Sequence, residues 1–313
     1  MHKETISEVD TKELNERTEK NAKSNRPKRR INFGPLWTLS PVTLWLLLFL
    51  FIPLGLILVV SFMKRGTHGG IDWTFTLENY ARFFEPLYLN IIYTSVAIAL
   101  ATTVICLVFG YPFAYIVAKA PAKYRTILLF LIIVPFWTNS LIRTYAWIIL
   151  LRTEGVINTI LLNLGIIAEP LTLLYNSGAT LLGFVYTLFP FAVLPLYATI
   201  EKLDNSLLEA ARDLGAKPWQ AFLKITFPLT MPGVVGASML VFIPTLGLFF
   251  ISDLMGGAKT MIIGNLIKNQ FLTARDWPFG AAASIILMVV TLLLILFYLR
   301  VSGGKTEDGM GLK

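Results

Sequence analysis

The sequence has little charge, almost no cysteine and almost no histidine. Charged residues make up 15% of its 313 residues, whereas about a quarter of the residues in a soluble domain are charged. The single cysteine, Cys106, excludes an intrachain disulfide. The two histidines, His2 and His68, are isolated from each other and do not suggest a metal site. These absences argue against a soluble domain, a disulfide-bonded secreted domain and a zinc protein.

Signatures of catalysis are missing as well. The run Gly303-Gly304-Lys305-Thr306 ends like a phosphate-binding loop. That motif needs a glycine five residues before its last glycine, and the position holds Leu299 instead. No nucleophile, base and acid occur in a recognisable arrangement. We therefore expect no catalytic residue, no cofactor and no metal in this chain, and we expect it not to be an enzyme by itself.

What the sequence does contain is long uncharged runs, in a chain that is 55% hydrophobic. A helix that spans a bilayer needs about 17–25 mostly apolar residues, and a lone span must satisfy its backbone hydrogen bonds internally. We predict an all-α membrane protein with six transmembrane helices. The six runs are Pro41–Met63, Pro86–Ala118, Thr126–Ile142, Pro170–Ile200, Ile225–Ser252 and Trp277–Leu299.

Most of the 27 Lys and Arg residues fall on one side of these spans. Because positive residues mark the cytoplasmic side, both termini and the loop 201–228 are predicted to be cytoplasmic. Residues 1–40 read as a basic tail without fixed structure, 41–300 as the membrane domain and 301–313 as a second tail. On the other side, 155–168 is too short to span and is predicted as a surface helix. The basic residues flank membrane spans, so a nucleic-acid partner is not expected.

The cytoplasmic segment 206–228 is predicted to form two short helices joined at a glycine. Ser206 and Glu209 have the spacing of a capping box at the start of the first helix. Gly215 is placed to end this helix, and Pro218 to begin the second. An apolar stripe that nothing else in the chain covers implies a partner. The stripe is Leu207, Ala210, Ala211 and Leu214.

This segment resembles the EAA loop of ABC importer permeases. Glu209-Ala210-Ala211 is followed after three residues by Gly215, and after nine more by Ile225 and Pro228, with Phe227 where the family usually has Leu. The resemblance implies a coupling helix that docks on a separate cytosolic ATPase. Its implied residues are Ser206, Glu209, Ala210, Ala211, Asp213, Leu214 and Gly215.

The resemblance extends over most of the chain. The stretches 133–143, 252–259 and 275–282 are similar to those of the B-type permease subunit of spermidine/putrescine importers. This resemblance implies a MetI-like six-helix bundle in a bacterial inner membrane and a homologous second permease subunit. It also implies two copies of the ATPase, which bind the ATP and Mg²⁺, and an extracytoplasmic polyamine-binding protein.

A path for polyamines needs carboxylates for the ammonium groups and aromatic faces for the cationic chain. Asp253 ends an uncharged run and is the first candidate. Trp137, Asn139 and Ser140 follow Pro135, where the span should kink and expose polar groups. Phe249 and Phe250 precede Asp253 by one turn and are candidates for an apolar gate.

Each path candidate also has an ordinary structural interpretation. Asp253 could pair with Lys259 or Arg275, Trp137 could be an interfacial anchor, and the two phenylalanines could simply pack. Arg143 could repel a cation or pair with an acid. Two other functions stay open: an ABC permease for iron, thiamine or an aminophosphonate, and a secondary transporter, although no inverted repeat is visible.

Overall fold

The computed structural model describes residues 34–67, 69–257 and 260–303. The chain divides into two units, Met1–Gly55 and Leu56–Lys313. Most of the predicted N-terminal tail and the residues 304–313 of the predicted C-terminal tail lie outside the described residues. The helix α2 (Gly34–Leu46) begins within the predicted tail 1–40. It continues through a π-helical turn, Leu47–Phe51, into α3 (Ile52–Ser61).

Within the described part of the chain, six helical segments are long and apolar enough to cross a membrane, which confirms the predicted number. The first, second and last follow the predicted runs closely. The fourth begins later than predicted, because the side chain of Asn176 accepts a hydrogen bond from the amide of Ala179 and caps the helix there. The six segments are Leu39–Ser61, Pro86–Lys119, Ser140–Asn163, Ser177–Glu201, Pro218–Gly247 and Trp277–Arg300.

The predicted third span, Thr126–Ile142, is wrong. The helix α6 (Ala122–Ile133) passes into a 3₁₀ turn, Val134–Trp137, and ends there. Thr138 is extended, and the side chain of Asn139 accepts a hydrogen bond of 2.8 Å from the Leu141 amide, which starts a new helix. This helix, α7 (Ser140–Leu151), leads into α8 and gives the third candidate span.

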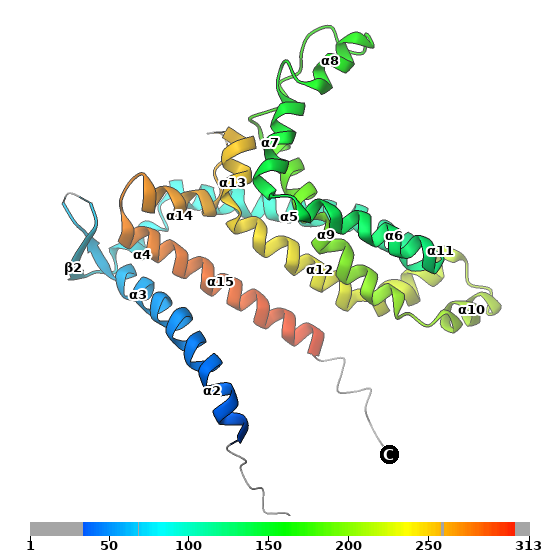
Figure 1. Ribbon diagram of the computed structural model, residues 1–313, viewed down its shortest axis with the longest axis horizontal. Helices are drawn as coiled ribbons and strands as arrows, with labels where there is room; N and C mark the ends of the chain where they lie inside the picture. The colour runs from blue at the N-terminus through cyan, green and yellow to red at the C-terminus, as the bar shows by residue number, and fades with distance from the viewer. Residues whose placement is uncertain (1–33, 68, 258–259, 304–313) are drawn as a thin grey trace, which may run out of the picture. The chain divides into compact units, whose positions relative to one another are not determined.

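The short helix predicted within 155–168 is present as α8 (Val156–Asn163). The third candidate span includes it, so its predicted position at the surface, outside the spans, stays a prediction. It lies beyond α7, away from the long helices (Figure 1). The buried side chain of Asn158 ties it to the following loop. Its amide donates to the Leu171 carbonyl at 2.9 Å, and its oxygen accepts from the Leu171 amide at 3.0 Å.

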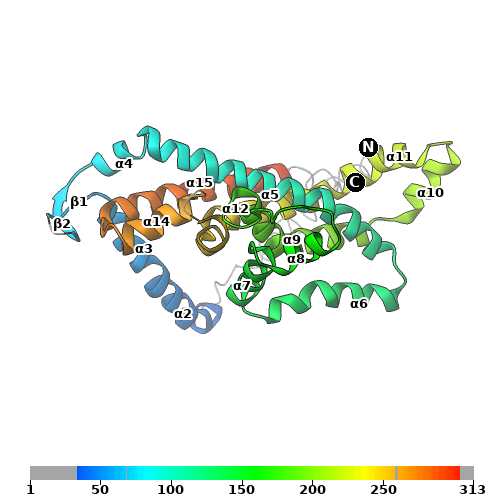
Figure 2. The same ribbon diagram turned by 90° about the horizontal axis from the view of Figure 1, so that it is seen from above.

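The core is formed by α5 (Pro86–Lys119), α9 (Ser177–Glu201) and α12 (Phe227–Gly247), which pack against one another (Figures 1 and 2). Small residues allow the close approach that membrane helices use in place of a hydrophobic driving force. A side chain at Gly110 would meet Val193 of α9, and one at Gly233 would overlap Thr199. The centre of α9, at Phe184 and Leu188, is fully enclosed.

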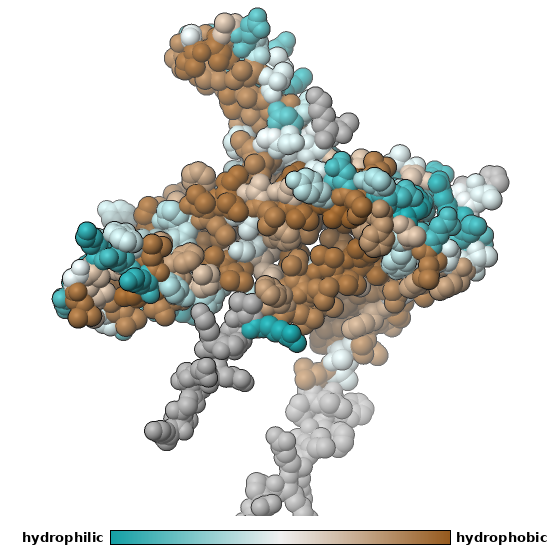
Figure 3. All heavy atoms as spheres, turned by 180° about the vertical axis from the view of Figure 1, so that it is seen from behind, coloured by the Kyte–Doolittle hydropathy of each residue, from teal (hydrophilic) through white to brown (hydrophobic). Residues whose placement is uncertain are grey.

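Smaller elements lie at the two ends of these helices. One end carries a hairpin of β1 (Met63–Arg65) and β2 (Ile71–Phe75), paired antiparallel, with α4 (Glu78–Arg82) and α14 (Ile263–Leu272). The helices α10 (Asn205–Asp213) and α11 (Pro218–Ala221) lie at the other end (Figures 1 and 2). Hydrophobic surface dominates between the ends, and hydrophilic residues gather mainly toward them (Figure 3).

A buried carboxylate joins the hairpin end to the last helix, α15 (Trp277–Gly303). Asp276 is 1% exposed and accepts a hydrogen bond of 2.9 Å from Arg82, while Arg65 lies at 3.9 Å. The Arg82 guanidinium lies 4.2 Å from the centre of the Phe279 ring. Burial lowers the pKa of Arg82, but its hydrogen bonds to Asp276 and Tyr88 outweigh this and leave the pKa raised. No local sequence pattern indicated this cluster.

The turn after Ser252–Gly256, a π-helical segment, depends on a glycine. Gly257 has φ 59° and ψ −156°, a region that only glycine occupies readily. Its replacement by alanine is therefore expected to destabilise the protein by about 1–3 kcal/mol. Thermal unfolding of the purified protein measures this. Gly247→Ala is the matched control, because nothing lies within 4 Å of that site. Equal melting temperatures for the two variants would contradict the prediction.

Candidate functional site

The first helix of the predicted coupling segment is capped by Asp204, not by Ser206. The Asp204 carboxylate accepts a hydrogen bond of 2.9 Å from the Ser206 amide, and α10 starts at Asn205. The predicted capping box of Ser206 and Glu209 is therefore wrong, because Asp204 occupies the cap position two residues earlier. The same hydrogen bond lowers the pKa of Asp204 below its ordinary value. The cap is consequently intact at neutral pH and is lost only as the pH falls through this lowered value.

The end of α10 is as predicted. Gly215 has φ 80°, and its amide donates to the Arg212 carbonyl at 2.8 Å. The Ala216 amide donates to the Ala211 carbonyl at 2.9 Å. This pair of bonds is the Schellman motif, which satisfies carbonyls that the helix leaves free.

The second helix of the segment begins at Pro218 as predicted, but it is continuous with the fifth span. The helix α11 passes through a π-helical turn, Phe222–Thr226, directly into α12. The predicted start of that span at Ile225 is therefore too late. The predicted end at Ser252 is also wrong, because Leu248, with ψ 69°, breaks the helix after Gly247.

The apolar stripe of α10 is largely exposed. Leu207 is 45% and Leu214 is 88% exposed, and Ala210 and Glu209 are exposed as well. Ala211 is the exception, because it packs inward and is buried. One side-chain contact holds the start of α10 to the bundle: the Lys119 ammonium donates to the Asn205 side chain. Just before it, Glu201 at the end of α9 pairs with Arg125 of α6 at 2.6 Å. The helix thus presents an uncovered apolar face on a fixed support.

Three of the six predicted path residues line one cavity of about 480 Å³. Asn139 and Ser140 reach it from the break before α7, and Phe250 reaches it from α13 (Phe249–Ile251). Trp137 lies outside it, 74% exposed, with its ring edge-on to Phe130 at 5.6 Å. The lining consists of Phe136, Thr138, Asn139, Ser140, Arg143, Thr187, Leu188, Phe191, Pro244, Leu248 and Phe250.

Phe249 and Asp253 lie together at a second place. Asp253 pairs with Lys268 and accepts a hydrogen bond from Asn265. The Lys268 ammonium lies 5.6 Å from the centre of the Phe249 ring. The partner of Asp253 is thus Lys268, which the sequence did not suggest, and not Arg275. Lys259, the other predicted partner, lies outside the described residues. Both Lys268 and Asn265 come from α14, across a turn that local spacing does not reveal.

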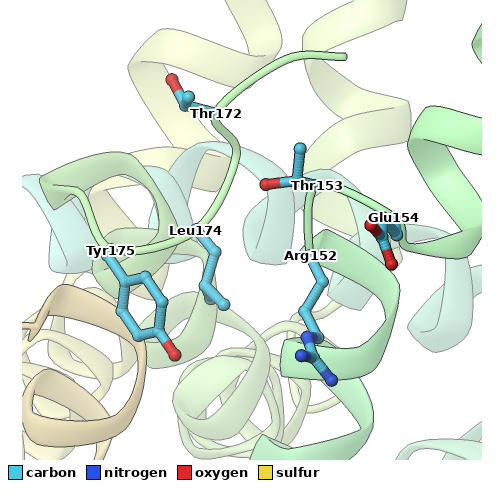
Figure 4. Close-up of a pocket in the computed structure, with 6 residues that line it drawn as sticks. All are labelled: Arg152, Thr153, Glu154, Thr172, Leu174 and Tyr175. Carbon is cyan, nitrogen blue, oxygen red and sulfur yellow. The ribbon is translucent and has the colours of Figure 1, made fainter.

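A further cavity of about 430 Å³ lies between α7, α8 and the loop before α9. It is lined by Arg152, Thr153, Glu154, Thr172, Leu174 and Tyr175. Arg152 and Tyr175 extend their polar ends to the same side, with Leu174 between them (Figure 4). Tyr175 has φ 60°, and its amide donates to the Met255 carbonyl at 3.0 Å. This bond fixes the loop against the segment that carries Asp253.

The described residues combine six candidate membrane spans with an open cavity between helices. Among the described residues, no group of three or more His, Cys, Asp or Glu is arranged to hold a metal. The chain instead combines a half-polar cavity beside broken helices with an exposed apolar helix at one end of the bundle. Irregular backbone at membrane depth is tolerated where it lines such a cavity.

Curated relatives cover most of the chain. It is 54% identical over 258 residues to "Spermidine/putrescine transport system permease protein PotB" of Salmonella typhimurium (strain LT2), covering 82% of this chain and 90% of that protein. The protein of the same name from Haemophilus influenzae is 47% identical and covers 85% and 93%. "Inner membrane ABC transporter permease protein YdcU" of Escherichia coli is 32% identical and covers 72% and 76%.

Solved structures support the fold. A bacterial ABC transporter that imports the acidic polysaccharide alginate matches with a TM-score of 0.68 at 20% identity, covering 88% of this chain and 98% of that one. The MetNI methionine ABC transporter matches with a TM-score of 0.53 at 17% identity, covering 71% and 97%. Residues 110–303 match the model of a protein family, "Binding-protein-dependent transport system inner membrane component". The chain therefore belongs to this family of inner membrane permeases.

Proposed function

We propose that this chain is the permease subunit of an ATP-driven importer of spermidine and putrescine. The observation that carries the proposal is the 54% identity with a spermidine/putrescine permease over 90% of that protein's length. In the proposed complex, a homologous second permease completes the membrane path. An extracytoplasmic binding protein delivers the polyamine, and two copies of a cytosolic ATPase bind ATP and Mg²⁺.

The coupling role is assigned to α10 and the glycine that follows it. The residues are those of the EAA loop: Ser206, Glu209, Ala210, Ala211, Asp213, Leu214 and Gly215. The exposed apolar face of Leu207 and Leu214 supports this assignment, because nothing in the described chain covers it. Closure of the ATPase dimer would move this helix as a rigid body and switch the spans between inward-facing and outward-facing states.

The cargo path is proposed to run past the cavity of Asn139, Ser140 and Phe250 and past Asp253. Phe250 provides an aromatic wall, and the two polar residues provide oxygens for an ammonium group. Asp253 is the acid that binds the cargo, with Phe249 beside it. Trp137 stays a proposed contact at the end of α6, outside this cavity.

The decisive experiment is uptake of labelled spermidine and putrescine by the complete complex in proteoliposomes. ATP inside the vesicles should drive accumulation of both polyamines, and omission of the ATPase should abolish it. Thiamine and an aminophosphonate serve as control solutes. ATP-driven uptake of a control solute without polyamine uptake would contradict the proposed cargo. Polyamine uptake that persists without the ATPase would indicate a secondary transporter.

One observation favours a second candidate function. Arg143 lines the cavity as a cation without an acidic partner in the described chain. An anionic solute such as an aminophosphonate would satisfy it directly. The uptake assay separates the two functions, because the two cargoes have opposite charge.

Asp253→Asn is expected to raise the KM for spermidine about tenfold, since a charge-assisted hydrogen bond contributes about 1.5–3 kcal/mol. Lys268→Gln is the matched variant. It removes the cation paired with Asp253 and keeps the carboxylate and its hydrogen bond from Asn265, so the KM should not rise. Uptake kinetics measured in proteoliposomes give both values. An unchanged KM in Asp253→Asn would remove this residue from the path.

A further inference from the structure

Arg143 lies between two cavities and is the charged residue in the lining of each. The larger cavity is the one of about 480 Å³. The smaller, of about 240 Å³, shares Phe136 with it and is also lined by Tyr186. The Arg143 guanidinium carbon is 5.0 Å from the centre of the Phe136 ring and 5.8 Å from that of Tyr186. Its Nε is buried and has no hydrogen-bond partner. The two rings hold the cation in position but do not neutralise it.

No acid of the described chain reaches Arg143. The ion pairs of those residues use Asp253, Glu201 and Asp276, each with another cation. A charged side chain inside a membrane domain is costly unless it is paired, and such residues usually face a cavity and find a partner there. The buried Nε without a hydrogen-bond partner and the adjoining cavity leave room for an anion beside Arg143.

The depth of the cavity limits what that anion can be. Thr187, Leu188 and Phe191 contribute its wall from the middle of α9. They lie ten to fourteen residues from the two ends of this helix, which is about 15–21 Å at 1.5 Å per residue. A lipid phosphate lies outside a hydrocarbon core that is about 30 Å thick, so it would not reach the centre. A side-chain carboxylate on a neighbouring transmembrane helix would reach it.

We propose that Arg143 pairs with a carboxylate of the second permease subunit across this cavity. The inference rests on the proposed function, because a polyamine is a cation and cannot itself neutralise Arg143. The cargo's ammonium groups and the Arg143 guanidinium then compete for one carboxylate. Arg143 is thus a positioning residue. It pairs with the carboxylate when the path is empty, and the cargo's ammonium group replaces it as the partner of the carboxylate when the cargo binds.

The first test is assembly of the complex, which does not depend on which cargo is carried. Arg143→Glu places two carboxylates against each other and should abolish co-purification of the second permease. Arg143→Gln removes the charge with a neutral side chain and should reduce co-purification of the second permease. Arg143→Lys keeps the positive charge and should co-purify as the wild type does. Normal co-purification of Arg143→Glu would overturn the proposal. So would an equal loss in the Lys and Gln variants, because packing rather than charge would then be the cause.

The second test is transport by complexes that assemble. Removal of the competing cation in Arg143→Gln should lower the KM for spermidine about tenfold and raise ATP hydrolysis in the absence of cargo. Arg143→Lys should keep both values within about twofold of the wild type. An unchanged or higher KM in Arg143→Gln would overturn the competition. Absence of polyamine uptake in the wild-type complex would instead refute the proposed cargo, while the assembly test still decides the pairing.

Discussion

Glu209→Lys is expected to abolish ATP-dependent uptake while the chain still inserts into the membrane in normal amount. Glu209 is exposed on α10, on the side of the helix away from Leu207 and Leu214. A reversed charge there would be buried without a partner when the helix docks, which costs several kcal/mol. Uptake of labelled spermidine and quantification of membrane-inserted chain together measure the effect.

Gly215→Pro should have the same effect for a different reason. The φ of 80° at Gly215 is incompatible with proline, and its amide donates to the Arg212 carbonyl. Gly215→Asn is the matched control, because asparagine tolerates this conformation. Glu78→Lys controls for the charge reversal on an exposed glutamate at the opposite end of the bundle. ATP-dependent uptake at the wild-type rate in both Glu209→Lys and Gly215→Pro would refute the coupling assignment.

Asp276→Ala is expected to destabilise the protein by about 3–5 kcal/mol, which is the usual cost of removing one partner of a buried ion pair. The substitution leaves the Arg82 guanidinium without its 2.9 Å partner. It also removes the acceptor for the Phe279 amide at the start of α15. A fall in the melting temperature of the purified complex, or loss of folded protein from the membrane, would report this effect.

The controls for Asp276 come from the same cluster. Arg65→Ala should cost less than about 1 kcal/mol, because Arg65 is half exposed and lies at 3.9 Å. The pKa of Arg82 is raised in the folded protein. The stability that its positive charge contributes is therefore fully present at any pH below the ordinary pKa of arginine, and it is lost only as the pH rises through the raised pKa. Stability of the wild type should therefore not change through loss of this charge near neutral pH. Equal stability of Asp276→Ala and Arg65→Ala would contradict the assigned role.

The sequence predicted the number of spans, because uncharged runs and membrane helices coincide. It misplaced the third because counting charges ignores Pro135, which lacks an amide donor, and Asn139, whose side chain starts a new helix. At α10 only Ser206 was predicted as the cap, although Asp204, two residues earlier, is of an equally suitable residue type. Nothing local decides between them, and the structure selects Asp204.

The candidate path was only partly predictable. Phe249 and Phe250 are adjacent, but successive helical residues point about 100° apart, so one lines the cavity and the other faces Lys268. The partner of Asp253 comes from across a turn, and that of Arg82 from the far end of the chain. Such contacts are set by tertiary packing, which spacing along the sequence does not encode.

The continuity of the fifth span has a mechanical consequence. From Pro218 to Gly247 no loop interrupts the helix, so it forms one rod of about 45 Å at 1.5 Å per residue. One end of the rod adjoins α10, and at the other Pro244 and Leu248 line the cavity that Arg143 shares. If α11 is displaced in the proposed transport cycle, these residues should move with it, less whatever bending occurs at the π-helical turn or at Pro232 and Pro244.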